Sequence, residues 1–256
     1  MARLMALLVF FVVVPLPPAE AAELAVVGQA TAAGALRSLA ARFEQQTGDK
    51  IVLQLGNPGV TRDRIKATPN ADVVILSASV HERLVKEGLL TDTTQVVLGQ
   101  SKIGMAVSAK AKKPAPFRNK ADFIAFLRKA KTIGLVDPKG GSGTSPPFMK
   151  AVEELGIASE IAPKYRYIPG AGENVAEAIA RGEVETGATA IPELVPNKGV
   201  KVVGALPADV LVFGSPTAAY LGPHASNPDE ARKFLRFLAT SAAMKAFRAI
   251  GLAPAS

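Results

Sequence analysis

The chain has 256 residues, of which 48% are hydrophobic, 20% charged and 5% aromatic. This composition is ordinary for globular proteins and excludes a wholly disordered, collagen-like or coiled-coil chain. The absence of cysteine excludes disulfides and thiol nucleophiles, and the only histidines, His81 and His224, are too few for a histidine-rich metal site. A net charge of +8 favours an anionic partner without identifying it.

Residues 1–21 have the layout of a secretory signal peptide. Arg3 precedes an apolar run at residues 4–14, and Ala19-Glu20-Ala21 provides a small-x-small cleavage site. The apolar run is shorter than the ~20 residues that span a bilayer, so we expect no stable membrane insertion. We therefore predict that this segment is removed on export and that the mature protein is soluble in the periplasm.

The first part of the mature chain alternates apolar runs with helical periodicity. Leu36, Leu39 and Phe43 give the stripe of a helix that ends near Gly48. Ser79 and Glu82 have the spacing of a capping box at the start of a later helix, which would leave His81 exposed. The strands expected here cover residues 24–27, 51–55 and 71–76. Such alternation is typical of a parallel sheet covered by helices.

A second α/β unit follows after an interruption of the pattern. Its expected strands cover residues 103–107, 132–136, 165–168, 186–191 and 200–203, with helices around residues 123–127, 148–155 and 174–181. An extended stretch at residues 210–221 and two helices, at residues 228–238 and 241–250, close the chain. His224 is expected in a surface turn. Two α/β units with closing helices predict two lobes.

Four glycine-rich turns lie between an expected strand and an expected helix. They cover residues 28–34, 56–60, 140–146 and 169–174. Helix starts offer unpaired backbone N–H groups and partial positive charge, so several converging starts form an anion site. Taken singly, each turn is better explained as a cap or tight turn, with Thr31 or Ser145 as N-cap, and only the joint occurrence of four favours a binding site. None has the spacing of a P-loop or a dinucleotide-binding motif.

Several segments together resemble the periplasmic molybdate-binding proteins of ABC importers. They are residues 31–48 (TAAGALRSLAARFEQQTG), 70–77 (NADVVILS), 137–138 (DP), 173–175 (ENV) and the closing region 224–252. The resemblance spans nearly the whole mature chain. It implies an α/β, two-lobe type II periplasmic-binding fold with two crossing hinge strands. It also implies a molybdate- or tungstate-like oxyanion held in an interlobe cleft by uncharged donors.

The resemblance also implies which residues bind the anion. The family's first-lobe serine falls on Thr31, and its second-lobe backbone contacts fall on Gly143 or Thr144 and on Val175. The family's serine cluster is replaced by Asn57-Pro58-Gly59, and its tyrosine falls near Ala190, which has no hydroxyl. We expect Thr31 and Asn57 to be the main side-chain donors, and the full set of ligand-binding residues is Thr31, Asn57, Gly59, Gly143, Thr144, Asn174 and Val175.

The missing hydroxyls leave the ligand open. We expect molybdate to bind more weakly than in typical members of the family, or another small anion, including an organic one, to be preferred. Contact with Arg62 or Arg64 would favour such a different ligand.

The lobes are expected to exchange the chain twice, near Ala106 and Pro216. This places residues 22–105 and 217–256 in one lobe and residues 106–216 in the other. Ligand binding is expected to close the hinge between them.

Two other classes of function are less well supported. An exported enzyme would need a nucleophile with its base or a metal, and no such pattern occurs, so we expect no catalysis and no cofactor. The basic stretch from Lys102 to Lys139 has few interleaved aromatic residues, so nucleic acid is not an expected partner. The expected partners are a small anion and an ABC transporter permease, with the receptor itself a monomer.

Overall fold

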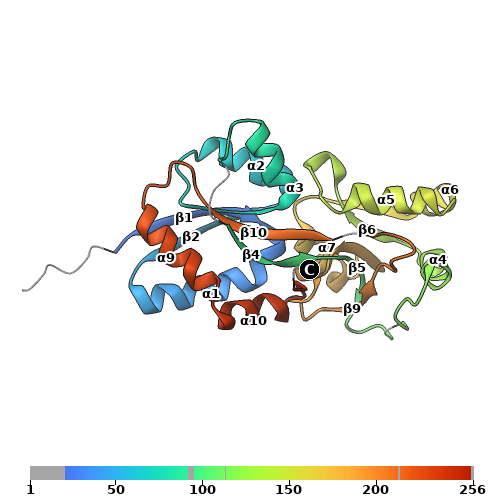
Figure 1. Ribbon diagram of the computed structural model, residues 1–256. Helices are drawn as coiled ribbons and strands as arrows, with labels where there is room; N and C mark the ends of the chain where they lie inside the picture. The colour runs from blue at the N-terminus through green and yellow to red at the C-terminus, as the bar shows by residue number, and fades with distance from the viewer. Residues whose placement is uncertain (1–20, 92–94, 113, 213, 255–256) are drawn as a thin grey trace, which may run out of the picture.

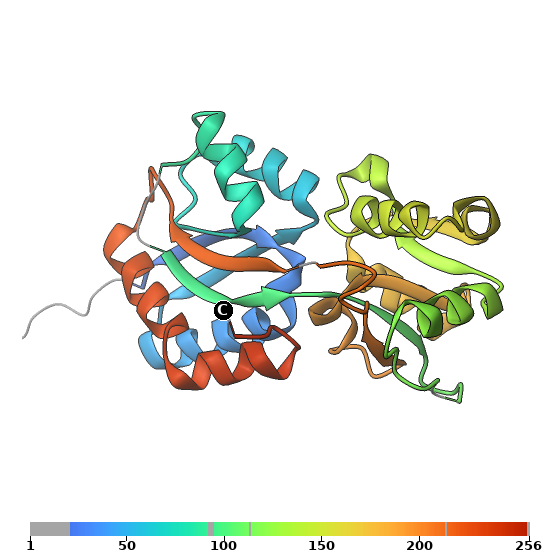
Figure 2. The same ribbon diagram turned by 45° about the vertical axis from the view of Figure 1, so that its right-hand side comes forward.

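The structure is a computed structural model that describes residues 21–91, 95–112, 114–212 and 214–254. The expected signal peptide therefore lies almost wholly outside the described residues. Within the described part, two five-stranded sheets with covering helices form the two lobes seen in Figures 1 and 2. This arrangement confirms the predicted two-lobe α/β fold.

The first sheet has the strand order β2-β1-β3-β10-β4. Strands β1, β2 and β3 are parallel, and β10 pairs antiparallel with both β3 and β4. The strands are β1 (Glu23–Gln29), β2 (Lys50–Gly56), β3 (Val73–Ser77), β4 (Gln95–Ser101) and β10 (Ser215–Leu221). Strand β4 was not expected from the sequence, and β10 begins at Ser215 rather than at residue 210.

The second sheet repeats this design in the order β7-β6-β8-β5-β9. Strands β6, β7 and β8 are parallel, and β5 pairs antiparallel with β8 and β9. The strands are β5 (Ile103–Ser108), β6 (Ile133–Val136), β7 (Tyr165–Ile168), β8 (Thr186–Ala190) and β9 (Val200–Ala205). Both sheets therefore place three parallel strands beside an antiparallel pair.

The helices of the first lobe pack on both faces of its sheet. On one face, Phe43 of α1 meets Phe234 of α9 edge to face, with ring centroids 5.0 Å apart, and Phe247 of α10 lies in the same core. The opposite face packs Ile65 of α2 and Leu84 of α3. Burying each of these side chains contributes about 1.5–3 kcal/mol. The helices are α1 (Ala33–Thr47), α2 (Pro58–Ala67), α3 (Ala78–Lys86), α9 (Pro228–Leu238) and α10 (Ser241–Ala249), with the 3-10 turn η1 (Ala30–Ala32) before α1.

The second lobe has the same layered construction. Phe123 of α4 and Phe148 of α5 fill one face, and Val175 and Ile179 of α7 fill the other with Leu194 of α8. The helices are α4 (Lys120–Lys129), α5 (Ser145–Glu154), α6 (Ala158–Ile161), α7 (Gly172–Arg181) and α8 (Ile191–Leu194), with the 3-10 turns η2 (Pro138–Gly140) and η3 (Ala162–Lys164).

The chain crosses between the lobes twice. The first crossing is at Lys102, because β4 ends in one sheet at Ser101 and β5 begins in the other at Ile103. The prediction near Ala106 was therefore four residues late, and residues 103–105 belong to the second sheet. The chain returns between β9 and β10, and Figure 2 shows both crossings side by side.

Two local predictions around α3 were wrong. Ser77 is the N-cap position of this helix and makes no side-chain cap, so Ser79 lies inside the helix and the Ser79–Glu82 capping box does not form. His81 is buried rather than exposed, because its ring stacks on Tyr220 at a centroid distance of 3.9 Å. His224 lies in an exposed turn, as predicted.

Candidate functional site

A cavity of about 360 Å³ lies between the lobes, where the strands of both sheets end. Its wall includes the last residues of six strands, namely Gln29 of β1, Gly56 of β2, Ser77 of β3, Ser101 of β4, Val136 of β6 and Ala190 of β8. Ligands of open α/β sheets bind at such carboxyl ends of strands. The volume is within the range of small-molecule pockets.

Five of the seven residues predicted to bind ligand lie in the cavity wall: Thr31, Asn57, Gly59, Gly143 and Thr144. The other two are not among the residues that line it. Val175 is fully buried in the core of the second lobe. The Asn174 side chain accepts a hydrogen bond from the Ala171 N–H at 2.9 Å, so it serves the start of α7.

The turn between β2 and α2 joins the two lobes. The Asn57 Oδ1 accepts from the Val60 N–H at 2.9 Å and caps α2, while its Nδ2 donates to the carbonyl of Gly170 in the second lobe at 2.8 Å. The Gly59 N–H donates to the carbonyl of Gly141 at 3.3 Å. We call these contacts the interlobe clasp. The donors of Asn57 and Gly59 therefore already have protein partners.

The clasp depends on the absence of side chains. A Cβ atom on Gly59 would lie 2.9 Å from the carbonyl oxygen of Gly140 and 3.1 Å from the Cα of Gly141. Gly141 itself has φ of 83°, a conformation that favours glycine. Gly59 was expected to bind ligand, and Gly141 lies in one of the glycine-rich turns, whereas here both let backbone approach backbone.

The start of α5 is satisfied by its own loop. The Ser142 Oγ accepts from the N–H groups of Thr144 and Ser145 at 3.3 and 3.1 Å. The Ser145 hydroxyl is fully buried and donates to the carbonyl of Val136 at 2.6 Å. Ser142, rather than Ser145, thus acts as the cap of this helix start.

Glu193 of α8 is a buried carboxyl group in the cavity wall that the sequence analysis missed. The residue is partly exposed as a whole, whereas burial of its carboxyl raises the pKa to about 7. Its Oε2 accepts from the Thr189 hydroxyl at 2.8 Å and its Oε1 from the Gly172 N–H at 3.3 Å, and both bonds limit the rise of the pKa. The first N–H of α7 therefore faces the protein's own carboxyl.

Gly172 is required for this contact. A Cβ atom there would lie 2.1 Å from both the Glu193 Oε2 and the Thr189 Oγ1. Only one of these partners, Thr189, is close to Glu193 in the sequence, and Gly172 of α7 meets it only in the folded chain. The only signal in the sequence was a threonine near the end of an expected strand with a glutamate four residues later, Thr189 and Glu193.

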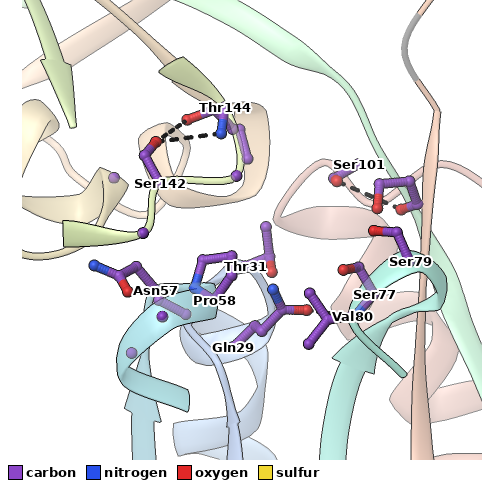
Figure 3. A pocket seen from close by; sticks show the side chains of 18 of the residues that line it. Gln29, Thr31, Asn57, Pro58, Ser77, Ser79, Val80, Ser101, Ser142 and Thr144 are labelled. Atoms are coloured by element: carbon purple, nitrogen blue, oxygen red, sulfur yellow. Dashed lines mark hydrogen bonds between the residues drawn. The ribbon is translucent and has the colours of Figure 1, made fainter. Parts of the chain in front are cut away.

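The first lobe contributes hydroxyl groups that have no such partners. Among the described residues, no hydrogen bond involves the hydroxyls of Thr31, Ser77 or Ser79, which line the cavity in Figure 3. The Gln29 Oε1 accepts from the Ser77 N–H, and η1 and α3 both begin without a side-chain cap. Ser101 at the end of β4 and Thr217 of β10 complete this side.

We call Thr31, Ser77, Ser79, Ser101 and Thr217 the first-lobe wall. The second-lobe wall comprises Ser142, Gly143, Thr144, Gly172 and Glu193.

The two arginines of the cavity also belong to the first lobe. Arg62 of α2 and Arg83 of α3 line it, whereas Arg64 does not and donates instead to the carbonyl of Leu55 at 2.7 Å. The Arg62 Nε lies 3.6 Å from the Asp63 carboxylate, and Arg83 makes no ion pair within the part of the chain described. Positive charge and free donors therefore occur on the same side of the cavity.

The described residues contain no group of three His, Cys, Asp or Glu side chains placed to hold a metal ion. No helix in the described ranges is long and apolar enough to cross a membrane. The site consists of hydroxyls, helix starts, two arginines and one carboxyl group.

Residues 24–253 match the family model described as bacterial extracellular solute-binding protein. The chain belongs to this family. A curated relative of this solute-binding protein is an aconitate isomerase from a Pseudomonas species, 30% identical over 226 residues, which cover 86% of this chain and 84% of the relative.

Solved structures with the same fold include other extracytoplasmic receptors. The periplasmic molybdate-binding protein of Azotobacter vinelandii superposes with a TM-score of 0.73 at 18% identity. The match covers 91% of this chain and 100% of that protein. The sulfate-binding protein SubI from Mycobacterium tuberculosis superposes with a TM-score of 0.68 at 17% identity, covering 92% of this chain and 88% of its own. At these identities the likeness shows the fold.

Proposed function

We propose that this solute-binding protein captures a small anion in the interlobe cavity and delivers it, in the periplasm, to the permease of an ABC importer. The observation that carries the proposal is the first-lobe wall, whose unpartnered hydroxyls line the same cavity as Arg62 and Arg83. Hydroxyl and guanidinium groups donate hydrogen bonds to carboxylate, phosphate or inorganic oxyanions. The family and the two-lobe fold support a receptor role.

The first ligand class to test is the molybdate- or tungstate-like oxyanion. The resemblance of the sequence and the fold of the molybdate-binding neighbour support it, and Thr31 supplies the expected hydroxyl. Two observations favour an organic anion instead. The cavity volume is that of a small-molecule pocket, and two arginines line it although the resemblance implies uncharged donors alone.

The test is titration of the purified protein with molybdate, tungstate, sulfate, phosphate, acetate and small dicarboxylates, by calorimetry and thermal shift. A ligand at a thousand times its Kd stabilises the native state by about 4 kcal/mol, which is easily detected. Binding of at least one anion at micromolar Kd, weakened in Thr31→Ala and unchanged in Ser38→Ala, is the expected result. Ser38 is an exposed hydroxyl residue of α1 outside the cavity wall and serves as the matched control. Failure of every anion to bind would contradict the proposal.

A second candidate function is acid–base isomerisation of a bound carboxylate, the kind of reaction named for the Pseudomonas relative. Glu193 favours it, because a cavity-wall carboxyl with a pKa of about 7 can both accept and return a proton near neutral pH. The carboxylate would remove a proton from a carbon next to the double bond of an unsaturated acid. The double bond would shift, and the same carboxyl would return the proton at the other end.

Incubation with cis-aconitate in deuterated water tests this second function. Proton NMR would show the trans isomer with deuterium at the allylic carbon. Glu193→Gln would abolish both the isomerisation and the uptake of deuterium. Tight anion binding without isomerisation or exchange would leave the receptor role alone.

A further inference from the structure

The first-lobe wall offers anion donors in two separate places, and this inference rests on the proposed function. Figure 3 shows Thr31 near the middle of the cavity, with Ser142 and Thr144 on one side and Ser77, Ser79 and Ser101 on the other. The first place is the Thr31 hydroxyl in the turn η1. The second is the start of α3, which is not among the four glycine-rich turns.

The start of α3 differs from the starts of α2, α5 and α7, because the Gln29 Oε1 accepts only from the N–H of the N-cap residue Ser77 and no side chain caps the helix itself. Asn57 caps α2, Ser142 covers the start of α5, and Asn174 and Glu193 cover the start of α7. At α3, Ser77 makes no side-chain cap, and the Ser77 and Ser79 hydroxyls have no partner within the described residues. Its nine residues are long enough to carry a helix dipole.

Thr217 provides an independent sign that an acceptor is missing here. It lies opposite Ser77 in the antiparallel pairing of β10 with β3, and the residue is only 1% exposed. Within the described part of the protein, its hydroxyl has no hydrogen-bond partner, although it belongs to the cavity wall. Buried hydroxyls in native proteins are nearly always paired, so this one points to a ligand group.

Ser101 and Arg83 surround the same place. Ser101 ends β4, pairs with Ser215 of β10, and its hydroxyl makes only a long 3.5 Å contact with the Ser215 carbonyl. Arg83 lies one helical turn beyond Ser79 on α3 and lines the cavity. A guanidinium that lines the same cavity as several hydroxyl donors suits a planar carboxylate, which accepts bidentate hydrogen bonds.

We propose that the ligand is a small dicarboxylate, with one carboxylate at Thr31 and the other at the start of α3 on Ser77, Ser79, Ser101 and Thr217. Arg62 and Arg83, which line the cavity from the first lobe, match the two negative charges of such a ligand.

The experiment compares acetate, malonate, succinate, glutarate, sulfate and molybdate by calorimetric titration of the full protein. One dicarboxylate is expected to bind at least tenfold tighter than acetate, sulfate and molybdate. Thr217→Val should weaken that dicarboxylate at least fivefold and leave acetate within twofold. Thr31→Ala should weaken both acetate and the dicarboxylate.

Thermal unfolding of the free variants separates a ligand contact from a structural one. Thr217→Val preserves the side-chain shape and removes a hydroxyl without a partner, so its Tm should equal or exceed that of the parent. A marked fall in the Tm of Thr217→Val, together with an equal loss of affinity for all anions, would overturn the inference. Molybdate binding more tightly than every dicarboxylate would also overturn it. Loss of all anion binding would overturn the proposed function itself, whereas dicarboxylate binding that is insensitive to Thr217 and Ser101 substitutions would overturn only the second place.

Discussion

The two walls of the cavity use similar residues in opposite ways. On the second-lobe wall, Ser142 and Glu193 accept from backbone N–H groups of α5 and α7, so the donors of these helix starts are already paired within the protein. On the first-lobe wall, Thr31, Ser77 and Ser79 make no hydrogen bond through their hydroxyls to the described residues. Glycine-rich turns alone therefore do not identify the donors. What distinguishes a binding wall is the absence of a protein acceptor.

The largest expected effect concerns Glu193. Its pKa of about 7 in the folded protein exceeds the ordinary 4.5, so the folded state binds more protons than the unfolded state between these two values. The free energy of unfolding should thus fall by about 3 kcal/mol in total as pH rises from 4.5 to above 7. Glu193→Gln should remove this part of the pH dependence. Denaturant unfolding from pH 4 to 8 measures it, and identical pH profiles for the two proteins would contradict it.

The two walls are compared directly by Thr31→Ala and Thr144→Ala. Thr31→Ala should weaken anion binding about tenfold to a hundredfold, because a ligand oxygen loses a hydrogen bond worth about 1–3 kcal/mol. Thr144→Ala should change the affinity less than threefold, because its side chain contacts Ser142 within its own loop. Calorimetry measures both, and Thr31→Ser should retain most of the affinity. Equal losses at the two positions would remove the distinction between the walls.

Gly59→Ala tests whether the interlobe clasp holds the cavity wall together. The added methyl would collide with Gly140 and Gly141, and such overpacking costs about 1–3 kcal/mol. We expect a larger radius of gyration in solution scattering and weaker anion binding than in the parent. Gly88→Ala is the control for a glycine with open space, although its φ of 71° carries a cost of its own. A scattering curve of Gly59→Ala that matches the parent would show that the lobes do not rely on this contact.

The smallest expected effect separates two serines. Ser142→Ala should destabilise the protein by about 1 kcal/mol, because two N–H groups lose their acceptor. Ser77→Ala should change stability by less than about 0.5 kcal/mol, since its hydroxyl is unpartnered. Chemical denaturation measures both values. The reverse order would mean that the first-lobe serine is structural.

The parts of the fold that depend on local periodicity could be predicted from the sequence. Leu36, Leu39 and Phe43 marked α1 because a buried helical stripe repeats within a few residues. Strand β4 was missed because it alternates polar and apolar residues weakly and contains Gly99 at a positive φ of 142°. The stacking of His81 on Tyr220 depends on the pairing of distant elements, which no local pattern encodes.

The candidate site divides in the same way. Turns next to strand ends placed Thr31, Asn57 and Thr144 at the cavity, since the fold class dictates where strands end. What each donor does there could not be predicted. Asn57 turned out to bond Gly170 of the other lobe, and Thr217 meets Ser77 only after β10 inserts into the first sheet.

That insertion has a consequence for the order in which the molecule assembles. The five strands of the second sheet are consecutive, from Ile103 to Ala205, whereas the first sheet is incomplete until β10 enters between β3 and β4. Contacts between distant segments form slowly because a long loop must close first. We expect the second lobe to fold early as a continuous unit. The first-lobe wall, which needs Thr217, would then form last. Anion binding would therefore indicate that the whole chain has folded.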